Sequence, residues 1–285
     1  MTKKRFAYTY EDYEDNNKTA ETMVADILAD EAFAQIDALE IGCWGNAWED
    51  SCQAIIDGMV ENKAAFAHIE DLAIGIMDFE DCEISWIIQG NYANLWQALP
   101  NLKHLTIQGS TELALGEIVH DQLESLEIIC GGLPMSVIKS IAQAKLPNLR
   151  KLVLYLGVDN YGFDGSAEAI EEALAEMQFP QLEYLGLLDS EIQDELVPVA
   201  LACPMMPELT TLDLSCGTLT DKGGALLLEG IPRFQKLAKL DLHHHFLSKD
   251  MMDKLAKLPI EVDLSEQTEP DEYHGELYYY ALITE

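Results

Sequence analysis

Apolar residues follow one pattern over most of the chain: an apolar residue, two residues of any kind, and then two leucine-like residues separated by one position. Such alternation is typical of a strand that buries one face. Successive copies begin between 21 and 33 residues apart, a spacing that indicates a structural repeat. The copies begin at Ile36, Ile69, Leu102, Leu123, Leu149, Leu182, Leu209 and Leu237, and a weaker ninth copy covers residues 259–265.

Between the predicted strands, apolar residues recur at steps of three and four, which predicts helices. One strand and one helix cannot enclose a core, so the copies are expected to stack into an α/β solenoid with a parallel sheet on one side. We therefore expect a cap over residues 1–35, repeats over 36–265 and a cap or tail over 266–285. The predicted helices cover residues 51–65, 84–99, 135–146, 166–177 and 221–231, and another begins the cap at 20–36.

The segment "LTTLDLSCGTLTDKGGALLLEGI" (209–231) resembles the consensus of leucine-rich-repeat proteins of the ribonuclease-inhibitor-like subtype. Two others, "LVLYLGVDNYGFDG" (152–165) and "LPIEVDLSEQ" (258–267), are similar to an uncharacterised bacterial leucine-rich-repeat family known by a locus tag. The resemblance implies a horseshoe with strands on the concave face and helices on the convex face. It also implies a cytoplasmic origin, but no activity.

Three consecutive histidines, His243 to His245, suggest a metal site at first sight. In the repeat pattern, however, they are the seventh to ninth positions of the eighth copy. Neighbouring strand residues face opposite ways, so the three side chains are not expected to meet at one ion. His243 is expected on the concave face, and we predict no metal site here.

The fifth position of each copy lies between the two leucines and should face the concave surface. In the last three copies it is Asp213, Asp241 and Asp263. Parallel strands are about 4.8 Å apart, so these carboxylates should stack, which should raise the pKa of at least one of them. Lys239 and His243 flank the middle aspartate and are expected to relieve the repulsion.

Beside this column the pattern places Tyr155, Tyr184 and Leu188 on the concave face, where exposed aromatic residues suit a binding surface. Trp44 and Trp48 follow the first predicted strand, and we expect them to close the open end of the core. Near the other end, "ELYYYALIT" (276–284) is expected to form either a short edge strand or a tail that folds back over the last repeat.

The chain carries a formal net charge of −34 from 51 acidic and 17 basic residues. Such a charge repels nucleic acids and anionic membranes and attracts basic partners. The six cysteines have no C-x-x-C spacing, which favours reduced core residues in a cytoplasmic protein. No basic N-terminal segment is followed by the apolar run of a secretory signal, and no apolar stretch is long enough to span a membrane.

No phosphate-binding, nucleophile-elbow or zinc-protease motif occurs in the sequence. We therefore expect no enzyme and no cofactor, but a scaffold that binds a basic protein or peptide on its concave face. Two alternatives stay open: a divalent-cation site on the aspartate column, and an acidic inhibitor that mimics nucleic-acid charge. The partner-binding residues are expected to be Tyr155, Tyr184, Leu188, Asp213, Asp241, His243 and Asp263.

Overall fold

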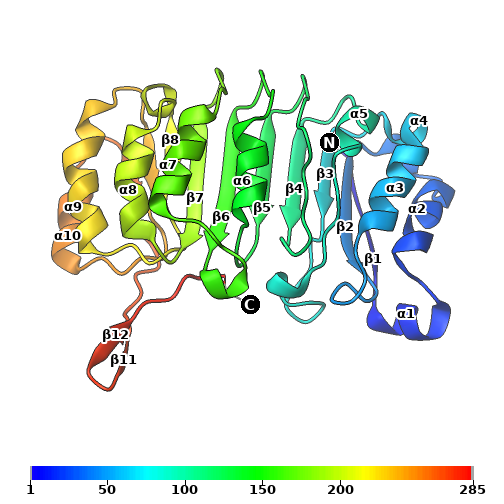
Figure 1. Ribbon diagram of the computed structural model, residues 1–285, viewed down its shortest axis with the longest axis horizontal. Coiled ribbons are helices and arrows are strands. Elements are labelled where there is room, and N and C mark those ends of the chain that lie inside the picture. Colours follow the sequence, from blue (N-terminus) through cyan, green and yellow to red (C-terminus); the bar gives the residue numbers. More distant parts are fainter. Residues whose placement is uncertain (1, 284–285) are drawn as a thin grey trace.

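The computed structural model describes residues 2–283 and shows a curved, single-layered sheet with helices along one side (Figure 1). Ten parallel strands follow one another in chain order across this sheet, as expected for a leucine-rich-repeat-like solenoid. They are β1 (Lys3–Tyr8), β2 (Ala38–Trp44), β3 (Asp71–Ile74), β4 (His104–Gln108), β5 (Ser125–Ile129), β6 (Lys151–Gly157), β7 (Tyr184–Ser190), β8 (Thr211–Asp213), β9 (Lys239–Asp241) and β10 (Glu261–Asp263).

The leucines of the repeat form the core. In the register of the sheet, the fourth position of each copy pairs with the fourth position of the next, for example Leu185 with Leu212 and Leu212 with Leu240. All three are fully buried. Burying one such side chain stabilises the fold by about 1.5–3 kcal/mol. The repeat pattern therefore predicts the architecture correctly.

Helices cover the convex side of the sheet. They are α3 (Gln53–Glu61), α4 (Lys63–Phe66), α5 (Leu95–Ala98), α6 (Met135–Ala142), α7 (Ala167–Glu176), α8 (Gln193–Ala202), α9 (Asp221–Gly230) and α10 (Lys249–Leu255), with η2 (Ile84–Trp86), η3 (Asp159–Tyr161), η4 (Met206–Glu208) and η5 (Ile231–Arg233) as short 3₁₀ turns. No helix among residues 2–283 is long and apolar enough to cross a lipid bilayer.

The helix predicted over residues 84–99 is wrong. This region has the 3₁₀ turn η2, an extended middle and the short helix α5. In the middle, Ile88 forms a parallel bridge with Thr111, and the buried Gln89 side chain donates to the Gln108 carbonyl at 2.7 Å. These contacts with the next repeat replace the hydrogen bonds of a helix.

The N-terminal region adds a strand that the apolar pattern does not predict. β1 pairs in parallel with β2, where Arg5 aligns with Glu40. The helices α1 (Tyr10–Asn16) and α2 (Ala20–Ala29) and the turn η1 (Phe33–Gln35) follow it. Trp44, the last residue of β2, is fully buried and donates from Nε1 to the Asp50 carbonyl at 2.7 Å, so it is part of the core, while β1 lies beyond it as the outermost strand. Trp48 is only half-buried.

At the other end of the solenoid, β11 (Asp271–Tyr273) and β12 (Glu276–Tyr278) form a separate antiparallel hairpin. Beyond the hairpin, the chain turns back and runs along the ends of the strands towards β7 (Figure 1). The Leu282 amide donates to the Cys216 carbonyl at 2.8 Å, and the Ile283 amide donates to Asp189 Oδ1 at 2.7 Å. The segment therefore combines features of both expected arrangements. Glu276–Tyr278 is a short strand, but it pairs in the hairpin and not with the edge of the main sheet, and the chain after it folds back as far as β7 rather than only over the last repeat.

Candidate functional site

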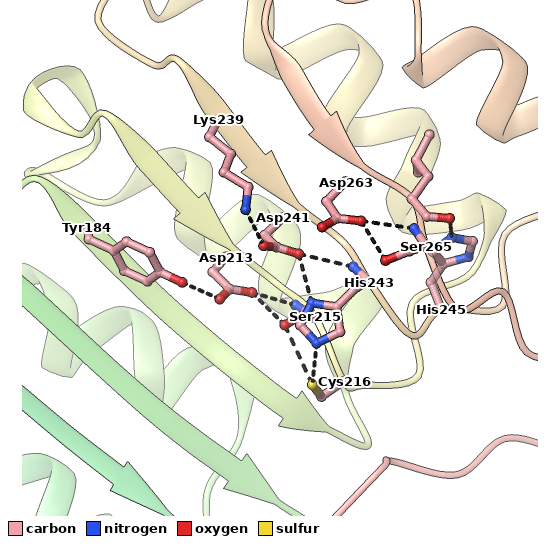
Figure 2. Close-up of polar contacts among 11 residues, drawn as sticks. Tyr184, Asp213, Ser215, Cys216, Lys239, Asp241, His243, His245, Asp263 and Ser265 are labelled. Atoms are coloured by element: carbon pink, nitrogen blue, oxygen red, sulfur yellow. Dashed lines mark hydrogen bonds and ion pairs between the residues drawn. The ribbon is translucent and has the colours of Figure 1, made fainter. Parts of the chain in front are cut away.

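The three aspartates lie side by side on β8, β9 and β10, as the repeat pattern predicts. Asp213 pairs with Asp241, and Asp241 pairs with Asp263, in the register of the sheet. Figure 2 shows the three carboxylates on one face, with Tyr184 on one side of them and Lys239 and His243 around the middle one. We call Asp213, Asp241 and Asp263 the aspartate column.

Each carboxylate of the column is held by neighbouring protein groups. Tyr184 Oη donates to Asp213 Oδ2 at 2.5 Å, and Ser215 Oγ donates to Asp213 Oδ1 at 2.6 Å. Lys239 Nζ lies 2.8 Å from Asp241 Oδ2. The Ser265 hydroxyl donates to Asp263 Oδ1 at 2.6 Å. Donors within the protein therefore reach at least one oxygen of each carboxylate of the column (Figure 2).

Two members of the column are less exposed than expected. Asp213 is 4% exposed and Asp241 is 7% exposed, whereas Asp263, next to the edge of the sheet, is partly exposed. Only Asp263 is therefore open to solvent to any extent, and Asp213 and Asp241 act mainly as acceptors for their own neighbours.

The pKa values of the column follow from these hydrogen bonds. Burial raises the pKa of Asp241, but hydrogen bonds from Lys239 and His243 outweigh burial and leave this pKa below its usual value. The side-chain and backbone hydrogen bonds of Ser265 likewise lower the pKa of Asp263. Neither of these two aspartates is therefore the member of the column whose pKa was expected to rise, because donors from the same repeats stabilise both carboxylates in the charged form.

Beside the column, a small apolar cluster lies outside the main core. Val153, Leu188 and Cys216 are buried in it, and Tyr155 and Tyr184 pack against them. Gly186 makes room for the cluster, because a Cβ atom there would lie 2.6 Å from Leu188 Cδ1. We call these five side chains the concave cluster.

The concave cluster includes a contact that the sequence pattern did not predict. Cys216 Sγ lies 3.3 Å from His243 Nε2, and His243 Nδ1 lies 2.8 Å from Asp241 Oδ1 (Figure 2). The three groups have the order of a nucleophile, a base and a residue that orients the base. Their repeat positions on neighbouring strands were visible in the sequence, but Cys216 was expected to be an ordinary core residue.

Burial of Cys216 limits what this arrangement can do. The residue is 2% exposed, and burial raises the pKa of its thiol to about 12. A thiolate is the reactive form of cysteine, so the protonated thiol at neutral pH is a weak nucleophile. The contact fits a packed thiol better than a catalytic one.

His245, the last histidine of the run, has surroundings that are separate from those of His243. His245 is fully buried, accepts at Nδ1 from the Leu247 amide at 3.1 Å, and donates from Nε2 to the Leu264 carbonyl at 3.2 Å. Burial lowers its pKa, so it is neutral at pH 7. Among residues 2–283, no three His, Cys, Asp or Glu side chains are placed to hold a metal ion.

Comparison with solved structures relates the whole fold to a protein of Bacteroides fragilis, whose crystal structure was a target of the Northeast Structural Genomics Consortium. The two are 38% identical, with a TM-score of 0.90 over 99% of this chain and 77% of the other. This chain belongs to the family of that Bacteroides protein. The Bacteroides protein therefore shares the fold described above over nearly all of this chain.

A second solved structure is the complex of Rad7 and Elc1 from yeast, with 10% identity over 92% of this chain and 80% of the other. Its TM-score is 0.29, a similarity too low to carry an argument. No family model and no curated protein matches the chain. What the site can do must therefore be argued from its own geometry.

Proposed function

We propose that this protein is a non-catalytic scaffold that binds a basic polypeptide segment on its concave face, between β6 and β10. The observation that carries the proposal is the concave cluster, an apolar group on the face of the sheet opposite the main core. An apolar centre with a charged and polar surround is the arrangement of a protein-binding surface.

Tyr155 and Tyr184 supply the anchoring side chains of this surface. Both rings are half-buried and pack on the buried Val153 and Leu188. Lys151 Nζ lies 5.2 Å from the centre of the Tyr184 ring, so this ring already accepts a cation within the protein. A lysine or arginine of the partner would use the neighbouring ring of Tyr155 in the same way. Leu188 is buried, so it would support the two rings from beneath rather than contact the partner.

The aspartate column would give this surface charge and rigidity rather than direct contacts. Asp263 and the neighbouring Glu261 are the more exposed carboxylates and would meet the basic residues of the partner. Asp213 and Asp241 would hold Tyr184 and His243 in place through the hydrogen bonds described above. Preformed side chains reduce the entropy lost on binding.

The protonated Cys216 supports a function without catalysis. The long helices α7, α8 and α9 between strands support the ribonuclease-inhibitor-like subtype.

The cation-site alternative is disfavoured, because donors within the protein already occupy oxygens of the column. Mimicry of nucleic-acid charge stays a prediction, and capture of a nucleic-acid-binding enzyme that is lost at moderate salt would support it.

A peptide-display selection against the immobilised protein tests the proposal. We expect enrichment of peptides with several lysines or arginines and one apolar residue. Tyr155→Ala should weaken the selected peptide at least about tenfold, the loss typical of an aromatic anchor. Asp263→Asn combined with Glu261→Gln should weaken it mainly at low salt.

The convex variant Leu226→Ala, at a side chain that is 37% exposed on α9, serves as the matched control and should bind normally. Peptides that bind equally to the wild type and to the Tyr155→Ala variant would show that the concave cluster is not the binding surface.

A further inference from the structure

A pocket with aromatic walls lies near the end of the sheet opposite the tail hairpin. Its lining residues come from the segments that follow β2 and β3. Its volume is about 300 Å³, and its walls are Trp48, Phe79, Cys82, Glu83 and Trp86. Phe79 is 70% exposed and Trp86 is 58% exposed. We call this group of residues the aromatic pocket.

The loop that carries the exposed rings is itself firmly held. Its neighbouring side chains Met77, Cys82 and Ile84 are buried in the core. The Cys82 amide donates to the Asp78 carbonyl at 3.2 Å, and the Trp86 amide donates to the Glu83 carbonyl at 3.0 Å. The exposure of Phe79 and Trp86 is therefore not due to a loose loop, because the backbone that carries them is anchored.

The third ring, Trp48, is fixed from behind. Its ring packs on Tyr10 with 5.5 Å between the ring centres, and Tyr10 stacks on Tyr13 at 5.9 Å. The pocket thus has one aromatic wall supported by the N-terminal helix α1 and two aromatic side chains from the next repeat. The Trp48 ring is therefore held in place before any ligand arrives, and the backbone that carries the other two rings is anchored as well.

The two segments that carry these rings are rich in carboxylates. The loop sequence from Asp78 to Trp86 is "DFEDCEISW", with four carboxylates in six residues, and Glu49 and Asp50 follow Trp48 directly. One of these carboxylates pairs with a basic group, since Arg5 Nη2 lies 3.9 Å from Asp81 Oδ2. Carboxylates and the faces of aromatic rings both attract cations.

The lining also indicates which kind of cation would bind. A primary ammonium group has three N–H donors to satisfy, whereas the lining offers one carboxylate, Glu83, among aromatic and sulfur-bearing side chains. A quaternary ammonium group has no N–H to satisfy and a low desolvation cost, and aromatic faces with a nearby carboxylate suit it. We propose that the aromatic pocket binds a quaternary ammonium head group, independently of the concave face.

Choline and its neutral carbon isostere, 3,3-dimethyl-1-butanol, test this proposal at constant ionic strength. Tryptophan fluorescence is the readout, since Trp48 and Trp86 line the pocket while Trp44 and Trp96 are buried. We expect choline to bind at least about tenfold more tightly than the alcohol, because only the cation gains from the ring faces and Glu83. Equal binding of the two compounds, or no binding of choline, would overturn the proposal.

Variants that keep all four tryptophans locate the site. Phe79→Ala should raise the dissociation constant for choline about tenfold, and Glu83→Gln should raise it severalfold. Tyr273→Ala, at an exposed tyrosine of the tail hairpin, is the control and should leave the constant unchanged.

A trimethyllysine peptide distinguishes the source of the head group: tighter binding than choline would indicate a modified polypeptide, and weaker binding a small molecule. Choline binding that Phe79→Ala leaves intact would place the cation elsewhere and contradict the assignment.

Discussion

Cys216 and His243 lie 3.3 Å apart, a distance at which a histidine can act as the base for a cysteine nucleophile. The surroundings of the sulfur decide between reactivity and packing. Val153 and Leu188 bury it, and the tail covers the backbone of the same residue through the bond from the Leu282 amide. At this scale, burial outweighs the favourable spacing, and the thiol stays protonated.

Slow alkylation of Cys216 is the corresponding prediction. A thiol pKa of about 12 leaves about three orders of magnitude less thiolate at neutral pH than an ordinary cysteine has. Iodoacetamide at pH 7.5 should therefore modify Cys216 at least about a hundredfold more slowly in the native protein than in urea, as measured by peptide mass spectrometry. Cys203, which is 4% exposed, is the internal standard. Faster modification of Cys216 than of Cys203, slowed by His243→Ala, would instead indicate an activated nucleophile.

The positions of the aspartates could be predicted from the sequence, but their surroundings could not. The repeat fixes the strand position of each residue, so the stacking of Asp213, Asp241 and Asp263 follows from counting. Whether a carboxylate is free depends on which rotamers its neighbours adopt. Tyr184 reaches Asp213 from the previous strand, and Lys239 turns towards Asp241 on its own strand. Side-chain choices of this kind are not contained in a periodic pattern.

Among the helices and strands, those that follow the repeat pattern could be predicted from the sequence, and those that depend on contacts with neighbouring repeats could not. The strands of the repeats were predictable because each buries leucines at fixed spacing. The strand β1 was not, because its sequence, "KKRFAY", lacks the leucine pattern and depends on pairing with β2. The helix expected at 84–99 fails for a related reason, since Gln89 bonds to the next repeat instead of facing solvent.

The tail is the element with the clearest pH-dependent contact. Asp189, at the end of β7, is fully buried and accepts from the Ile283 amide, while its Oδ2 has no hydrogen-bond partner among the described residues. Burial raises the pKa of Asp189 to about 8, although the backbone amides of Ile283 and Leu282 oppose this shift. The folded protein therefore binds a proton here that the unfolded chain, with an ordinary aspartate pKa, has released.

This proton makes folding less favourable as the pH rises. The contribution of the bound proton on Asp189 to the unfolding free energy is complete below pH about 4. It decreases above that pH and is lost as the pH approaches about 8. Relative to Asp189→Asn, the wild type should lose up to about 1.4 kcal/mol of unfolding free energy per pH unit in this range, measured by urea denaturation at pH 5 and pH 8.

Asp263→Asn is the matched control for this measurement. The pKa of Asp263 is lowered in the folded protein, so both its folded and its unfolded values lie below pH 5. Its difference from the wild type should therefore be constant between pH 5 and pH 8. A constant difference for Asp189→Asn as well would mean that the Asp189 carboxyl is ionised in the folded state.

Over the whole molecule, only part of the basic residues lies on the sheet, where several of them pair with carboxylates. On the concave face, Arg5 pairs with Glu40, Lys151 with Glu127 and Lys239 with Asp241. The helix α7, in contrast, has four glutamates and no basic residue. Much of the charge of −34 therefore lies on the convex helices and loops. It supplies a long-range attraction for basic partners, while close contacts on the concave face are set by its tyrosines.

Such a charge also opposes folding through self-repulsion, which salt screens. Raising NaCl from about 20 mM to about 500 mM should therefore raise the thermal midpoint, by about 5 °C if screening recovers about 2 kcal/mol. CaCl₂ at the same ionic strength should raise it no further, because donors within the protein already hold the carboxylates of the column. Differential scanning fluorimetry of both series provides the measurement. A stabilisation that is specific to calcium and that Asp263→Asn removes would instead place a cation on the aspartate column. The hydrogen-bonded column described above would then be its cation-free state.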